Sequence, residues 1–168
     1  MKDNPLFSCD AVLHFDPIDL DLPGCESKET AEAVEATFEG LHVLLEPAVA
    51  ALARAQSDYA GGLWGFVVAL DGRAGFWYPL DCDTYNVSVD SNGFSHPFMP
   101  ATAFGAGLTL TAVREYIEYC EQSARGPGAL DANEIAELEM LCDRLHEFVL
   151  ELAADNLLDG ESFLGFVD

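Results

Sequence analysis

Basic residues are scarce in this chain. Seven lysine and arginine residues stand against thirty aspartate and glutamate residues, and the formal net charge is −23. Because phosphate groups are bound mainly through lysine and arginine, this scarcity argues against direct binding to nucleic acid. A negative charge of this size is compatible with high solubility, a salt-rich habitat, a basic partner or imitation of a polyanion. Composition alone does not choose among these four.

Long hydrophobic runs are missing as well. Glycine, aspartate or glutamate interrupts the apolar stretches every few residues, so none approaches the ~20 residues that cross a bilayer. The first residues also lack the basic start and the apolar run of a signal peptide. We therefore expect a cytoplasmic protein that has no membrane partner. Its 168 residues, half of them hydrophobic, are enough for one domain with its own core.

Motifs that carry chemistry are also lacking. The five cysteines include no C-x-x-C pair, and none of the four histidines has a second histidine or a cysteine at zinc-binding spacing. There is no G-x-S-x-G, Walker A or H-E-x-x-H pattern. We expect reduced cysteines, most of them buried as small apolar side chains, and we expect no cofactor and no metal.

Three weaker patterns leave chemical alternatives open. Cys82 and His96 would form a nucleophile and a base if the chain brought them together. Asp81 and Asp83 flank Cys82 and are candidate ligands for a cation, although acidic turns usually serve only to solvate a loop. Residues 105–107 read Gly-Ala-Gly, like a piece of a phosphate-binding loop, but they lie inside an expected helix. We favour a structural interpretation of each and expect a protein that is not an enzyme.

Hydrophobic periodicity predicts an α+β fold in a single domain: a four-stranded antiparallel β-meander, with one wetter face, packed with about four helices. The strands are expected over residues 63–70, 76–79, 84–89 and 94–99, with turns over 71–75 and 90–93. The helices are expected to begin near Lys28, Pro47, Pro100 and Asp131. After a turn at Asp159-Gly160, a short apolar end over 163–167 closes the chain.

Acidic residues recur every four positions on the last long helix, and we call these residues the acid series: Glu139, Asp143, Glu147, Glu151 and Asp155. Successive members stand ~6 Å apart along a helix axis. Like charges at this spacing disfavour a helix by about 0.2–0.5 kcal/mol per pair, so the four pairs cost on the order of 1–2 kcal/mol. Either the series is a solvated face, or it is a surface offered to a basic partner.

The chain from Leu45 onward resembles the ArdB/KlcA antirestriction family of plasmids, phages and genomic islands. The resemblance is most specific in a pattern of tyrosine, paired glycines, tryptophan and phenylalanine: Tyr59, Gly61, Gly62, Trp64 and Phe66. Looser similarities follow in residues 75–79, 99–107, 144–150 and 166–168, so that about two thirds of the chain is covered. The chain departs from the family pattern in having Pro100 where a serine is usual, and in having no counterpart for its first 44 residues.

This resemblance implies an antirestriction protein that relieves type I restriction-modification of incoming DNA by non-catalytic interaction with the host complex or an associated protein. Residues 45–168 would form the antirestriction-like domain. Residues 1–44 would be an acidic extension with one helix, in which residues 1–27 form either a loose arm or an edge strand over 11–15.

Two sets of residues are candidates for the function that the resemblance implies. The candidate partner-binding residues are the acid series and Asp168. For the motif residues we favour core packing, with direct partner contact as the alternative. A direct DNA mimic, which acts through its acidic surface, is the alternative to the implied function.

Overall fold

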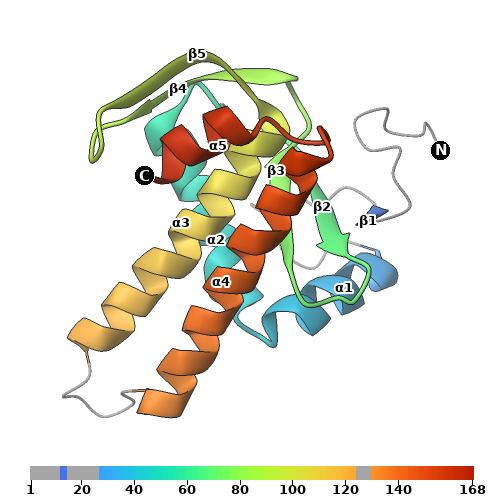
Figure 1. Cartoon of the computed structure of the whole chain (residues 1–168), viewed down its shortest axis with the longest axis vertical. Coiled ribbons are helices and arrows are strands. Elements are labelled where there is room, and N and C mark those ends of the chain that lie inside the picture. Colours follow the sequence, from blue (N-terminus) through green and yellow to red (C-terminus); the bar gives the residue numbers. More distant parts are fainter. Residues whose placement is uncertain (1–11, 15–26, 124–129) are drawn as a thin grey trace.

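Five helices and five short strands make up the described part of this computed structural model, which comprises residues 12–14, 27–123 and 130–168 (Figure 1). In chain order the elements are β1 (Val12–His14), α1 (Lys28–Phe38), α2 (His42–Gln56), β2 (Trp64–Ala69), β3 (Gly75–Pro79), β4 (Thr84–Val89), β5 (Phe94–Pro100), α3 (Ala101–Gln122), α4 (Ala132–Ala154) and α5 (Gly160–Val167). The strands pair antiparallel, so the predicted α+β class is confirmed.

Both expected hairpins form. In the first, β2 and β3 pair with Phe66 opposite Trp77, and Gly72 in the turn has a φ of +71°. In the second, β4 and β5 pair with Val89 opposite Phe94, and Gly93 has a φ of +73°. Glycine adopts this left-handed backbone without the steric cost of a side chain, which explains the tight turns between alternating strands.

The two hairpins lie in separate sheets, where we expected one continuous meander: β1-β2-β3 form one sheet and β4-β5 the other. The outer edge of β3 is occupied by α3. The backbone N–H of Trp77 donates to Oγ1 of Thr109 at 3.3 Å, and a Cβ on Gly105 would lie 2.2 Å from the Trp77 carbonyl oxygen. Because a helix backbone already sits against this edge, no strand can pair there.

The outer edge of β4 is likewise covered, by the chain that follows α2. Ser57 forms an isolated bridge with Val87, and the carboxylate of Asp58 accepts the backbone N–H of Asn86 at 3.0 Å and its amide at 2.6 Å. The register of β4 against β5 shifts between Tyr85 and Val87, so Asp58 holds the backbone at a bulge. Both edges that would have joined the hairpins therefore have other partners.

The first sheet also differs from the wet-faced sheet that we predicted. Residues 64–68 of β2 and all of β3 are buried, since α1, α3 and α4 also pack against these strands. In β4, by contrast, buried and exposed residues alternate, as expected of a strand with one solvated face. Of the two possibilities for the N-terminal arm, the described residues Val12–His14 show the edge strand, β1, paired with β2.

Helix starts follow their capping residues. Ser27 accepts the N–H of Thr30 at the start of α1, and Asp131 with Glu134 forms a capping box at the start of α4. In the sequence, glycine and proline at residues 126–128 predict the end of α3, and these residues lie outside the described part of the chain. The apolar end of the chain, which we predicted without a helix, is α5, whose N-cap is Asp159.

The prediction for Pro47 was wrong: α2 begins five residues earlier, at His42, and Pro47 lies inside it. The amides of Leu44 and Leu45 bond to the Leu41 carbonyl at 2.9 and 3.1 Å and start the helix there. Proline removes only the amide that would bond to the carbonyl of Val43, a residue on the exposed side. Water can solvate that carbonyl, so the helix tolerates the proline.

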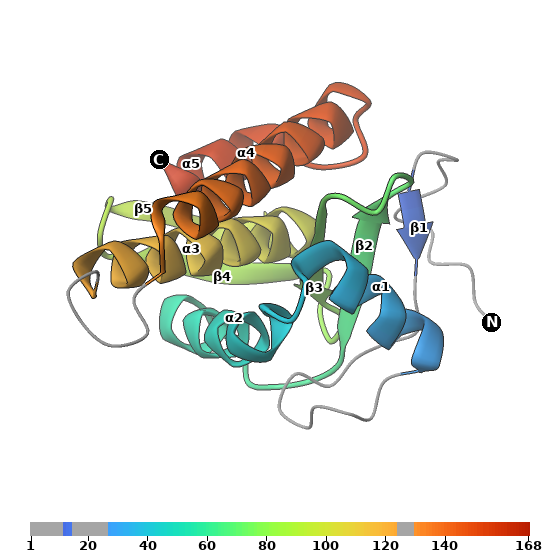
Figure 2. The same cartoon turned by 90° about the horizontal axis from the view of Figure 1, so that it is seen from below.

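The helix α3 is the centre of the molecule, and it lies between α2 and α4 (Figure 2). Its first ten residues, 101–110, are all buried, and most of them are small. Val34 and Phe38 of α1 belong to the same hydrophobic core, where the Phe38 ring stacks on Trp77 with centroids 4.7 Å apart. The expected boundary between residues 44 and 45 falls inside α2.

Within the described residues, no single helix is long and apolar enough to cross a membrane. Only α1 and α2 counted together reach that length and composition, and they meet at a 97° bend.

The close approach of α3 to β3 predicts an unusual response to alanine. In an exposed helix, replacing glycine by alanine stabilises by up to about 1 kcal/mol. Here we expect Gly105→Ala to lower the free energy of unfolding by about 3 kcal/mol, because its Cβ would meet strand backbone that cannot move aside. Gly107→Ala is the matched control, since the atoms nearest to its Cβ would belong to the Phe166 side chain and not to backbone, and we expect a smaller loss. Urea unfolding monitored by circular dichroism measures both, and a Gly105→Ala protein as stable as the parent would contradict this packing.

Candidate functional site

All the candidate partner-binding residues are solvent-exposed. Four members of the acid series lie on α4, Asp155 is the C-cap of the same helix, and Asp168 caps the far end of α5. None of the six takes part in an ion pair within the described residues, and the nearby Arg144 forms none either. The structure therefore leaves these carboxylates uncompensated by basic side chains and accessible to a partner.

The acid series does not form a single face. A step of four residues overshoots one helical turn, so each member is rotated by about 40° from the one before it. Over four steps the direction changes by about 160°, and Glu139 and Asp155 point to nearly opposite sides of α4. Neighbouring members such as Glu147 and Glu151 still share a side. A rigid partner would therefore contact two or three of these carboxylates together, but not all five.

The three aromatic motif residues are buried at the entrance to β2, where Gly61 is half-buried and Gly62 is exposed. Gly61 and Gly62 have φ angles of +119° and +150°, which glycine alone adopts without strain. Trp64 Nε1 donates to the Tyr59 hydroxyl at 2.7 Å, and that hydroxyl donates to the Gly62 carbonyl at 3.3 Å. The rings of Trp64 and Phe66 are 0% and 1% exposed. The three aromatic residues can therefore serve a partner only by shaping the surface above them.

Cys82 and His96 do not form the pair that one of the alternatives required. Partial desolvation, the neighbouring carboxylate of Asp81 and two further aspartates raise the pKa of the Cys82 thiol. A raised pKa leaves little thiolate at neutral pH, so this exposed cysteine is a poor nucleophile. The Tyr85 hydroxyl accepts the Cys82 backbone N–H at 3.2 Å and donates to Asp81 at 2.5 Å. Tyr85 thus positions the loop that carries the cysteine.

His96 belongs instead to a hydrogen-bond chain that sequence reasoning missed. Its Nδ1 accepts the N–H of Phe98 at 3.2 Å, so the neutral ring carries its proton on Nε2, which lies 3.3 Å from Ser162 Oγ. The Ser162 hydroxyl donates in turn to Asp159 at 2.7 Å. A catalytic serine must donate to its histidine, and here the bonds run the other way. The chain therefore links the start of α5 to β5.

The electrostatics of Asp159 support that structural role. Partial burial favours its neutral acid, but hydrogen bonds from the Ser162 side chain and from the amides of Ser162 and Glu161 outweigh this and lower the pKa of Asp159. An ionised carboxylate at a helix N-terminus is stabilising. Only the order of residues 159–162, in which an aspartate precedes a serine by three positions, signals this cap in the sequence.

The remaining chemical alternatives find no support in the described residues. No group of three or more histidine, cysteine, aspartate or glutamate side chains is placed to hold a metal ion in that part of the chain. Residues 105–107 lie within α3, where the glycines give room to Trp77 and Phe166. Of the described cysteines, Cys120 is buried, Cys142 is half-buried and Cys82 is exposed; Cys9 and Cys25 lie outside the described residues.

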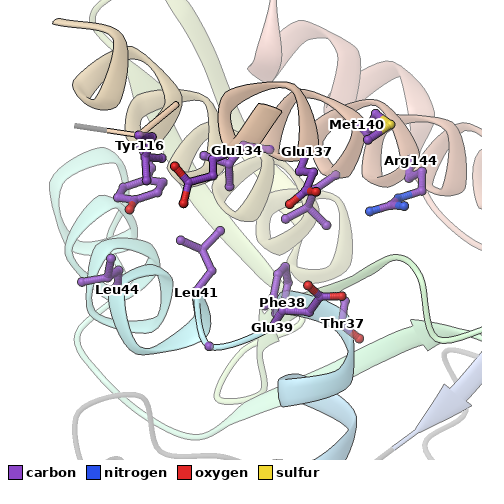
Figure 3. A pocket seen from close by; sticks show the side chains of 14 residues that line it. Thr37, Phe38, Glu39, Leu41, Leu44, Tyr116, Glu134, Glu137, Met140 and Arg144 are labelled. Atoms are coloured by element: carbon purple, nitrogen blue, oxygen red, sulfur yellow. The ribbon is translucent and has the colours of Figure 1, made fainter. Parts of the chain in front are cut away.

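A groove that the sequence did not indicate lies between the turn joining α1 and α2, the middle of α3 and the first half of α4 (Figure 3). Its volume is about 580 Å³. Four lining side chains are charged: Glu39, Glu134, Glu137 and Arg144. The apolar lining comes from Phe38, Leu41, Leu44, Tyr116, Leu138, Met140 and Leu141. Sequence periodicity assigned several of these to helix faces but did not bring the three segments together.

The chain matches no protein-family model, no curated protein and no solved structure. The site must therefore be interpreted from its own geometry.

The Tyr59–Trp64 hydrogen bond predicts a stability role for the motif. Tyr59→Phe keeps the ring but leaves the buried Trp64 N–H without its acceptor, so we expect the free energy of unfolding to fall by about 1–3 kcal/mol. Tryptophan fluorescence during urea unfolding measures the loss. Tyr119→Phe is the control, because that tyrosine is 66% exposed and should change stability little. Equal stability of the two variants would argue against the buried Tyr59–Trp64 hydrogen bond.

Proposed function

We propose that this protein is a non-catalytic antirestriction protein, which acts in the cytoplasm and relieves type I restriction-modification of incoming DNA. It would do so by binding the host restriction complex or a protein associated with it. The observation that carries the proposal is the acid series of α4: its carboxylates are exposed, and none has a basic partner within the described residues. A repulsive arrangement of this kind costs stability by itself and is relieved when a basic surface binds.

Two further observations support binding rather than catalysis. The reactive side chains considered above are either chemically disfavoured, as Cys82 is by its raised pKa, or committed to structural hydrogen bonds, as His96 and Ser162 are. In the segment that resembles the ArdB/KlcA family, the side chains of Tyr59, Trp64 and Phe66 are buried and belong to the hydrophobic core. The choice of type I restriction-modification as the target rests on the resemblance. The proposed mode of recognition, in which carboxylates bind a basic surface, rests on the charge.

A plating assay tests the biological role. Unmodified phage should plate with higher efficiency on a host with an active type I restriction system when the host also expresses this protein. A host that lacks the restriction system is the control, and on it the protein should make no difference. If the protein accumulates in soluble form in the restricting host and plating stays unchanged, the antirestriction role is wrong.

Charge reversal tests which surface is used. We expect the double substitution Glu147→Lys and Glu151→Lys to remove most of the rescue, because these neighbouring carboxylates share one side of α4. Glu118→Lys with Glu121→Lys makes the same change in net charge on exposed positions of α3, and this variant should retain rescue. Equal loss in both variants would show that only overall charge matters.

Direct DNA mimicry is the second candidate function, favoured by the density of exposed carboxylates. It predicts that the purified protein competes with duplex DNA for the restriction enzyme, and that competition weakens strongly as salt rises. The curvature of the acid series around α4 argues that it imitates a strand of phosphates only over two or three charges. Rescue in cells without competition in vitro would favour binding outside the DNA groove of the enzyme.

A further inference from the structure

The groove combines exposed apolar side chains with a rim of like charge. On its apolar side, Leu44 of α2 is 51% exposed and Met140 of α4 is 52% exposed. Between them, Leu41 projects from the turn toward α4, above the buried Phe38 (Figure 3). Apolar surface left in water is a source of binding energy for any occupant that covers it.

Three carboxylates stand on the rim against one guanidinium group. Glu134 and Glu137 project from α4, Glu39 projects from the turn opposite, and Arg144 lies toward one end of the groove (Figure 3). Glu134 is partly committed, since its carboxylate accepts the N–H of Asp131 at 2.7 Å. Glu39 and Glu137 form no ion pair within the described residues. The local charge is therefore negative and largely uncompensated.

The position of Glu39 is set by an unusual backbone. It ends α1 in the left-handed conformation with φ +49°, and its N–H donates to the Glu35 carbonyl at 2.7 Å. Gly40 follows with φ +85°, and the chain turns sharply into α2, at a bend of 97°. This turn holds one rim carboxylate opposite those of α4, and a positively charged side chain in the groove would lie between them.

Charge complementarity selects the occupant. A second copy of this chain would bring another net charge of −23 and few basic residues, and nucleic acid would bring phosphates. A small anion would meet three carboxylates for each guanidinium. A helix with apolar residues at i, i+3, i+4 and i+7, and with lysine or arginine beside them, fits both parts of the groove. Its apolar side chains would cover the apolar lining, and its basic side chains would face the carboxylates of the rim. A volume of about 580 Å³ has room for several such side chains.

We propose that this groove binds a basic amphipathic helix of a partner protein. Its apolar side chains would cover Leu41, Leu44 and Met140, and its cationic side chains would pair with Glu39 and Glu137. This inference goes beyond the antirestriction proposal, since it concerns other residues than the acid series and does not depend on which protein carries the helix.

Peptide binding to the full-length protein tests it. The probe is a fluorescein-labelled peptide of about 16 leucine and lysine residues with leucine at helical spacing, and binding is followed by fluorescence anisotropy. We compare it with a scrambled peptide of the same composition, at ~50 mM and ~500 mM salt. Binding should favour the patterned peptide by about tenfold and should weaken at high salt. Equal binding of the scrambled peptide would show unspecific attraction of a polycation and would overturn the proposal.

Variants locate the binding site. Leu44→Ser with Met140→Ser should weaken binding about tenfold, whereas Leu63→Ser with Leu70→Ser, at exposed positions outside the groove, should leave it unchanged. Glu39→Gln with Glu137→Gln should weaken binding several-fold at low salt. Glu147→Gln with Glu151→Gln, which removes the same charge from the acid series, should have a smaller effect.

Two further outcomes would overturn the proposal. One is that the groove variants and their controls bind alike while circular dichroism shows all of them folded. The other is that sedimentation shows self-association that Leu44→Ser with Met140→Ser abolishes, because the occupant would then be a second copy. Neither outcome bears on the plating assay, so failure of this inference and failure of the antirestriction role are distinguishable.

Discussion

The contact between α3 and the outer edge of β3 organises this structure. Glycine at position 105 lets a helix backbone approach a strand backbone where any side chain would collide, and Thr109 supplies the acceptor that the Trp77 amide would otherwise have sought in a neighbouring strand. The first sheet therefore ends at β3, and the hairpin of β4 and β5 forms a separate sheet. With its first ten residues buried, α3 then supplies the common surface on which the other helices assemble.

Two tyrosine hydroxyl groups each bond to more than one polar group in this arrangement. The Tyr59 hydroxyl serves both the Trp64 indole and the Gly62 carbonyl, while the Tyr85 hydroxyl organises the loop at Asp81 and Cys82. Side chains that would suggest chemistry in the sequence are thus used to join elements. The surface carries the exposed carboxylates, and the proposed recognition surfaces are the acid series and the groove beside α4.

Several features of the fold were predictable from the sequence because their causes are local. Alternation and turn glycines placed four strands and both hairpins, and the caps at Ser27 and Asp131 placed two helix starts. The start of α2 was mispredicted because proline is common at the first position of a helix. Proline is also tolerated inside a helix where the carbonyl that loses its backbone hydrogen bond faces water. The separation of the sheets was not predictable, since it depends on which element reaches an edge first.

The sequence by itself determined most of the helices and strands, the excess of negative charge and the exposure of the acid series, because each follows from periodicity or composition along the chain. Only the tertiary structure decided that His96 meets Ser162, that the glycines of α3 face β3 and α5, and that Glu39 stands across from Glu137. These relations join residues far apart in sequence. They form only when helices pack together, and how two helices pack depends on the side chains of every element in contact with them.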